Sequence, residues 1–165
     1  ESSLTPVIML LERLHGVDLG SGNLVDSDLV APEVNWLQSN DFGLLDLTAA
    51  SDLVTPAAVL LAIGGGGTIV GVGHTQRKES RRLSTTEKLL FDFGLKAHVR
   101  AEGVIDIPGG QSPKRPEWDV KTYSDHRVAM TAMALASLVG ATIEGEGCIG
   151  ATHPSFHQML MAISS

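Results

Sequence analysis

The chain has 165 residues, the size of one domain, and 43% of them are hydrophobic while 19% are charged, so a packed core is expected and wholesale disorder is excluded. A net charge of −7 with 4% aromatic residues argues against binding to nucleic acid, which favours a broad basic face and stacking rings. Cys148 is the single cysteine, which excludes an internal disulfide, and no apolar run approaches the ~18 residues of a membrane span, so a reducing cytoplasm is expected.

Helix and strand periodicities alternate along most of the chain. The opening segment 4–14 is predicted to be a helix, and residues 15–43 are interpreted as short strands and loops. From there the predicted elements are a strand at 44–48, a helix at 53–63, a strand at 68–73, a helix at 79–93, a hairpin of 95–99 with 104–107, a strand at 118–123, a helix at 127–138, a strand at 141–146 and a helix at 156–163.

The second part of this series repeats the first. Ser51-Asp52 opens one Ala-rich helix and Ser124-Asp125 opens another, and the strand TIVGVG of the first copy corresponds to TIEGEG of the second at a nearly equal spacing. An α/β fold with two similar units, at about 44–107 and 118–163, is therefore expected within a single domain covering 1–165. The second copy has no sequence left for a hairpin, so its sheet should lack strands.

Basic residues concentrate where a Gly-rich strand enters a helix. Residues 74–82 contain four basic side chains against one acidic side chain. Backbone N–H groups at a helix start, surrounded by Arg and Lys, form an anion site. The alternative is a solvated first turn, but cations there oppose the helix dipole at a cost of about 0.3–1 kcal/mol each, which a bound anion would offset.

At the corresponding corner of the second copy, charged residues again lie between a predicted strand and a buried helix. Asp125 is most simply a helix cap, and His126 is either a hydrogen-bonded structural histidine or a catalyst. Arg127 directly precedes an apolar run, so its half-buried guanidinium calls for a carboxylate or a phosphate. Asp52, at the matching place in the first copy, is also a cap candidate. A carboxylate and two basic sites at such corners would suit an anionic substrate and a proton acceptor.

Other patterns indicate structural roles. The run 64–67 of four glycines lacks the Lys-Ser/Thr of a phosphate loop and is interpreted as a helix stop and a turn. His153 and His157 are four residues apart but lack the context of a metal motif, so surface or structural roles are favoured and no metal is expected.

The corner segments resemble a known family. Lys78-Glu79-Ser80-Arg81-Arg82, the run Tyr123-Ser124-Asp125-His126-Arg127-Val128-Ala129-Met130 and Thr152-His153-Pro154-Ser155-Phe156 are similar to the C-terminal part of the EPSP synthase (3-phosphoshikimate 1-carboxyvinyltransferase) family, over about residues 44–163. The resemblance implies inverse βαβαββ repeats, three per domain in two domains, with helices packed inside short mixed sheets. The family's enzymes are more than twice this length, so the chain is expected to be most of a C-terminal domain whose partner is the N-terminal domain.

The resemblance also implies a reaction. The family transfers the enolpyruvyl group of phosphoenolpyruvate to the 5-hydroxyl of shikimate 3-phosphate and releases phosphate, without a metal or an organic cofactor. Arg82, Arg127 and Lys78 would bind phosphoenolpyruvate, a compact polyanion that suits planar guanidinium groups.

Further roles are implied for the groups that move protons. Asp52 would accept or orient the attacking hydroxyl, Lys78 and Glu79 would handle protons during addition and elimination, and His126 would lie beside the arginines. The chain departs from the family at Ala151, where a Lys that holds phosphoenolpyruvate is usual.

Two other departures concern the first motif: within it Arg81 stands in place of the usual Asp, and just before it Gln76 stands in place of the usual Arg. Two alternatives to the family reaction remain open. One is a non-catalytic anion-binding or scaffold domain derived from the enzyme, and the other is an enolpyruvyl transferase acting on a UDP-sugar. We expect the isolated chain to be inactive, since the shikimate 3-phosphate site of the family lies largely on the N-terminal domain.

Overall fold

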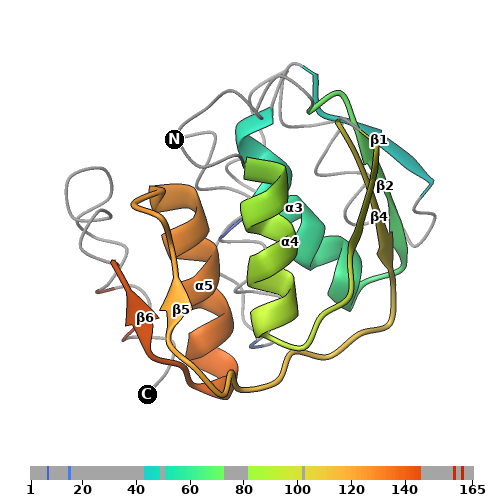
Figure 1. Cartoon of the computed structure of the whole chain (residues 1–165). Coiled ribbons are helices and arrows are strands. Elements are labelled where there is room, and N and C mark those ends of the chain that lie inside the picture. Colours follow the sequence, from blue (N-terminus) through green and yellow to red (C-terminus); the bar gives the residue numbers. More distant parts are fainter. Residues whose placement is uncertain are drawn as a thin grey trace.

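The computed structural model of the chain describes residues 7, 15, 43–48, 51–72, 82–101, 103–145, 158 and 161, and Figure 1 shows their arrangement. The elements in chain order are β1 (Leu44–Asp46), the 3-10 helix η2 (Ser51–Leu53), α3 (Val54–Ile63), β2 (Gly66–Val70), α4 (Arg82–Asp92), β3 (His98–Ala101), β4 (Val104–Pro108), β5 (Val120–Lys121), α5 (His126–Val139) and β6 (Ile143–Glu144).

The first sheet has four strands in the order β1-β2-β4-β3. β1 pairs with β2 in parallel, with Leu44 opposite Thr68, because α3 carries the chain back across the sheet between them. β4 is antiparallel to both β2 and β3, and the hairpin between β3 and β4 turns at Gly103, whose φ is 78°. The order of elements from β1 to β4 is βαβαββ, so the predicted repeat of this α/β fold is observed in full in the first unit.

The second unit repeats the parallel crossover. β5 and β6 pair in parallel, with Val120 opposite Ile143, and α5 connects them. Among the described residues this sheet has two strands. The described part of the second unit therefore contains the strand–helix–strand core of the first unit without a hairpin.

Three helices form the core between the two sheets, as Figure 1 shows. α3 is apolar on every side, and all its residues from Val54 to Ala62 are buried, as expected of a central helix. α4 is amphipathic: Leu83, Leu90 and the following Phe93 are buried, while Phe91 is 68% exposed. All three helices begin at the same end of the molecule (Figure 1), which brings their first turns together.

Several strands are shorter than the sequence predicts. The strand expected at 118–123 is Val120–Lys121, because Tyr123 and Ser124 both adopt left-handed backbone conformations, with φ of 54° and 57°. The strand expected at 141–146 is described as Ile143–Glu144 and ends at Gly145, where φ is 85°. Likewise, the strand expected at 44–48 ends at Asp46.

The glycine run was only partly predicted correctly. Gly64 follows α3 as the expected helix stop, but Gly66 and Gly67 belong to β2 rather than to a turn. A Cβ at Gly66 would lie 2.4 Å from the backbone nitrogen of Gly109, so close backbone contact explains why glycine is used there.

Two predicted helices fall largely on residues that the structure does not describe. The predicted helices at 4–14 and 156–163 lie outside the described residues except for Val7, Gln158 and Met161. Of the helices in the described residues, none has the length and apolar character needed to cross a membrane.

Candidate functional site: a cluster of arginine and aspartate at three helix starts

The first turns of the three core helices carry the charged residues of the predicted site. Asp52 lies in η2, directly before α3, while Arg82 is the first residue of α4 and Arg127 the second residue of α5. The strand-to-helix corners of both units therefore meet at one end of the core, although Asp52 and Arg127 are far apart in the sequence.

Asp52 bridges the two guanidinium groups. Arg82 Nη1 donates to Asp52 Oδ1 at 2.9 Å, and Arg127 Nη2 donates to Asp52 Oδ2 at 3.2 Å. The two arginines, one from each repeat unit, are thus held on opposite oxygens of a single carboxylate. Such charge-assisted hydrogen bonds fix the direction in which each planar guanidinium points.

Asp125 also links α4 and α5, the two helices that carry these arginines. Its Oδ1 accepts the backbone N–H of Arg127 at 2.9 Å, which caps α5, and its Oδ2 accepts Arg82 Nε at 3.3 Å. The backbone N–H of Asp125 donates to the carbonyl of Thr122 at 3.0 Å. The left-handed residues Tyr123 and Ser124 make the sharp corner that brings Asp125 to this position.

Burial makes these charges dependent on one another. The side chains of Arg82 and Asp125 are each 7% exposed and that of Arg127 is 21% exposed, while that of Asp52 is 41% exposed. A buried guanidinium requires anionic partners, because desolvation without them costs several kcal/mol. Within the described part of the chain, Arg127 Nε is buried without a hydrogen-bond partner, so one donor of the cluster lacks an acceptor.

The structure brings together three of the predicted site residues and describes a fourth. Asp52, Arg82 and Arg127 converge, and His126 is half-buried as the first residue of α5, where it has an interaction of its own. Lys78 and Glu79 lie outside the described residues. The same holds for the other positions that the sequence singled out: Gln76, Arg81, Cys148, Ala151, His153 and His157.

The sequence analysis missed one member of the cluster. It assigned Asp125 a capping role, which is correct, but not the contact with Arg82. The signal was present in the repeat: Asp125 occupies the position in the second unit that Asp52 occupies in the first, and both bind Arg82. Among the described residues, no group of three or more His, Cys, Asp or Glu side chains is placed to hold a metal ion.

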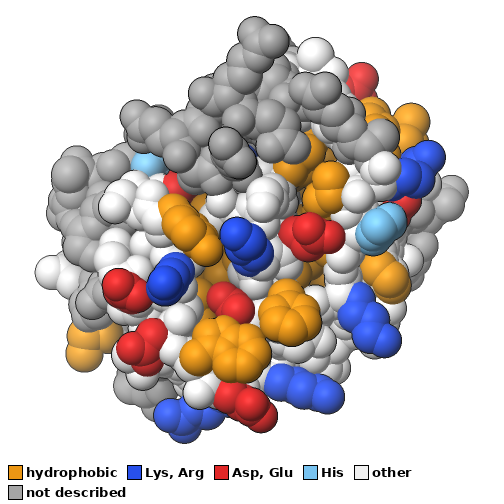
Figure 2. Space-filling model, in the orientation of Figure 1, with side chains coloured by type: hydrophobic (Ala, Val, Ile, Leu, Met, Phe, Trp, Pro, Cys, Tyr) orange, Lys and Arg blue, Asp and Glu red, His pale blue; other side chains and the backbone are white. Residues whose placement is uncertain are grey.

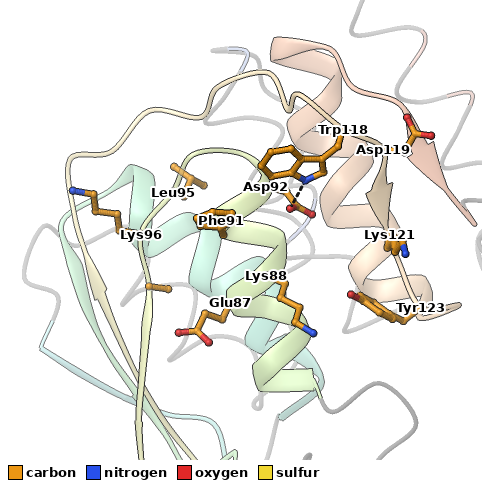
Figure 3. A pocket seen from close by; sticks show the side chains of 11 residues that line it. Glu87, Lys88, Phe91, Asp92, Leu95, Lys96, Trp118, Asp119, Lys121 and Tyr123 are labelled. Atoms are coloured by element: carbon orange, nitrogen blue, oxygen red, sulfur yellow. Dashed lines mark hydrogen bonds between the residues drawn. The ribbon is translucent and has the colours of Figure 1, made fainter.

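A cavity lies at the other end of α4 and does not include the cluster. It measures about 570 Å³, and Figure 3 shows its aromatic lining. Phe91 stacks on Trp118 with ring centroids 6.2 Å apart, Trp118 Nε1 donates to Asp92 at 2.7 Å, and Lys88 Nζ lies 5.8 Å from the ring centre of Tyr123. Figure 2 shows hydrophobic and charged groups interspersed on this face. The low aromatic content of the chain gave no indication of such a grouping.

The fold and the cluster together define a class: an α/β domain of βαβαββ units with paired arginines at converging helix starts. The family model described as EPSP synthase (3-phosphoshikimate 1-carboxyvinyltransferase) matches residues 26–160 of the chain. The chain therefore belongs to the EPSP synthase family.

Curated relatives agree with this assignment. The chain is 35% identical over 120 residues to the 3-phosphoshikimate 1-carboxyvinyltransferase of Methanosphaerula palustris, covering 72% of this chain and 27% of the relative. It is 31% identical over 168 residues to that of Caldicellulosiruptor saccharolyticus, covering 97% of this chain and 38% of the relative. The chain thus spans well under half the length of these relatives.

A solved structure agrees at the level of the fold. The EPSP synthase of Acinetobacter baumannii superimposes with a TM-score of 0.56 at 18% identity, covering 70% of this chain and 28% of that one. This likeness supports the α/β fold described above.

Proposed function

We propose that the chain is most of the C-terminal domain of a 3-phosphoshikimate 1-carboxyvinyltransferase of the shikimate pathway, which leads to aromatic amino acids. The enzyme would transfer the enolpyruvyl group of phosphoenolpyruvate to the 5-hydroxyl of shikimate 3-phosphate and release phosphate. The observation that carries the proposal is the convergence of Arg82 and Arg127, from two helices and two repeat units, on one carboxylate. Family membership and the names of the relatives support it.

The cluster suits phosphoenolpyruvate because this substrate is a small polyanion. Arg82 and Arg127 present planar donors that can bind a carboxylate or a phosphate at two points. The N-termini of α3, α4 and α5 add partial positive charge at the same end of the core. Arg127 Nε, buried and without a partner among the described residues, is a donor that a bound anion would satisfy.

The proposed chemistry assigns proton transfers to residues around the arginines. Protonation of the methylene carbon of phosphoenolpyruvate makes the neighbouring carbon electrophilic, and the 5-hydroxyl oxygen adds there as its proton leaves. Loss of a methyl proton and of phosphate then regenerates the double bond. In this scheme Asp52 receives or orients the hydroxyl proton, Lys78 and Glu79 exchange protons with the methyl carbon, Lys78 also helps to bind phosphoenolpyruvate, and His126 lies beside the arginines.

The proposal includes a second domain and a location. We expect the N-terminal domain of the same enzyme to supply most of the shikimate 3-phosphate site, and the enzyme to act in the cytoplasm. No metal, cofactor, nucleic acid or membrane enters this scheme. The chain by itself should bind phosphoenolpyruvate weakly and release no measurable phosphate.

A phosphate-release assay tests the proposal. The chain would be assayed with both substrates, first alone and then together with the N-terminal domain, or as part of the full-length protein. We expect release only when both domains are present, and loss of release on substitution of Arg82 by Ala. Turnover by the chain alone would refute the need for a second domain. The absence of turnover when both domains are folded and present would refute the enzymatic function.

A further inference from the structure

Asp52 occupies the donors that an anionic ligand of this site would use. Arg82 Nη1 and Arg127 Nη2 both donate to its carboxylate, at 2.9 and 3.2 Å. A carboxylate held by two guanidinium groups has the charge and the planar shape of the ligand group that such a pair recognises. In this structure an internal side chain therefore takes the place of a substrate anion.

The two aspartates of the cluster differ in exposure and in their contacts with the backbone. Asp125 is 7% exposed, caps α5 through Arg127 N–H, and is braced by the carbonyl of Thr122, so its position is fixed by the backbone. Asp52 is 41% exposed and lies in η2, a helix of three residues. Of the two, Asp52 has the exposure that exchange with an external anion requires.

Exchange would leave the arginines in place. If Asp52 moved away, Arg82 would keep its hydrogen bond from Nε to Asp125, and Arg127 would stay at the start of α5. Arg82 Nη1 and Arg127 Nη2 would then be free, next to the buried Arg127 Nε. Asp125 would thus remain in place to support Arg82.

We propose that Asp52 is an internal competitor of the anionic substrate, which must displace the Asp52 carboxylate from at least one of Arg82 and Arg127 in order to bind. The ligand class is a compact multiply charged anion such as a phosphate ester, because a weak monoanion gains too little to replace a carboxylate already held by two guanidinium groups. Identification of that anion as phosphoenolpyruvate rests on the proposed function. Displacement would also free Asp52 to face the attacking hydroxyl group.

The inference predicts opposite changes in anion affinity for substitutions of the two aspartates in the cluster. In the full-length protein, the affinities for inorganic phosphate and for phosphoenolpyruvate would be measured by calorimetry without the second substrate. Asp52→Asn removes the competing charge but keeps the size of the side chain, so both anions should bind about tenfold more tightly, the equivalent of one charge-assisted hydrogen bond. Asp125→Asn loosens the support of Arg82, so both anions should bind more weakly.

Asp106→Asn is the matched control, because Asp106 also pairs with an arginine, Arg100, but on the four-stranded sheet. It should leave both affinities unchanged. Unchanged or weaker binding by Asp52→Asn would overturn the inference. Thermal melts establish that each variant is folded, and Asp52→Ser gives the same test if the Asn variant does not fold. Turnover of the wild type, measured separately, tests the proposed function, so the two can fail independently.

Discussion

At the scale of the residue, Arg127 is the side chain whose environment most clearly calls for a ligand. Its Nη2 binds Asp52, and its buried Nε has no partner among the described residues. Replacement by Ala removes the charge and both donors. In the full-length protein, with the proposed function, we expect Arg127→Ala to raise the KM for phosphoenolpyruvate by about 10–100-fold, as charge-assisted hydrogen bonds of about 1.5–3 kcal/mol imply.

The control for this prediction is Arg100→Ala. Arg100 also pairs with a single aspartate, but its side chain is 61% exposed and lies on β3. Its loss should leave steady-state kinetics unchanged. Equal effects of the two substitutions would show that Arg127 does not contact the substrate.

Part of the cluster could be predicted from the sequence. The need of a half-buried guanidinium for an anionic partner points to Arg127, and the repeat indicates that its corner corresponds to that of Asp52. Arg82 is distinguished from the other basic residues of 74–82 by the family resemblance and not by residue type. The contact between Arg82 and Asp125 could not be predicted, because it depends on the packing of α4 against α5 and on the backbone turn at Tyr123 and Ser124. Sequence periodicity carries no information about such a turn.

At the scale of the element, the register of β2 depends on a glycine. Gly66 has a φ of +77°, and a Cβ there would meet the backbone nitrogen of Gly109 at 2.4 Å. Gly66→Ala should therefore lower the free energy of unfolding by about 3 kcal/mol, through backbone strain and displacement of β4. Gly43→Ala is the control, since a Cβ at Gly43 would meet nothing within 4 Å. Urea denaturation of both variants would check this, and equal midpoints would contradict it.

The same example shows why element boundaries were harder to predict than elements. The apolar segments correctly indicated a helix at 53–63 and a strand after it. The start of the strand inside a glycine run could not be predicted, because what selects glycine there is the backbone of residues 107–109, far along the chain. Likewise β5 ends early because of the turn that leads to α5 and not because its residues disfavour strands.

Asp106 links three strands of the first sheet and predicts a pH dependence. It accepts from Thr68 Oγ1 at 2.6 Å and from Arg100 Nε at 2.8 Å. These hydrogen bonds, first that of Thr68 and then that of Arg100, lower the pKa of Asp106 below its usual 3.8. Because the pKa is lower in the folded state, the carboxylate stabilises the fold above the unfolded-state pKa, and this contribution is lost as the pH falls through the folded-state pKa.

Asp106→Asn should thus unfold at a lower urea concentration than the wild type at pH 7. The gap should close as the pH drops below the usual carboxyl range around 3.8. Denaturation midpoints measured at a series of pH values check this. A gap that stays constant down to acid pH would mean that the carboxylate charge has no role at this position.

At the scale of the whole molecule, α4 connects two surfaces of different character. Arg82 at its start belongs to the arginine and aspartate cluster, while Phe91, near its end, lines the cavity with Trp118. Phe91 lies nine positions after Arg82, roughly 14 Å along the helix axis. The cavity has the more conspicuous shape, yet the charges that suit an anionic substrate lie at the opposite end of the helix.

Substitution of Trp118 distinguishes the two surfaces. Trp118 is 50% exposed, stacks on Phe91 and donates to Asp92, at the end of α4 opposite to Arg82. If catalysis belongs to the helix starts, Trp118→Ala in the full-length protein should leave kcat and the KM for phosphoenolpyruvate within about twofold of the wild type, with only a small loss of stability from the lost stacking. Arg82→Ala, at the other end of the same helix, should abolish turnover. A loss of turnover in a folded Trp118→Ala variant would mean that the cavity, and not the cluster alone, takes part in the reaction.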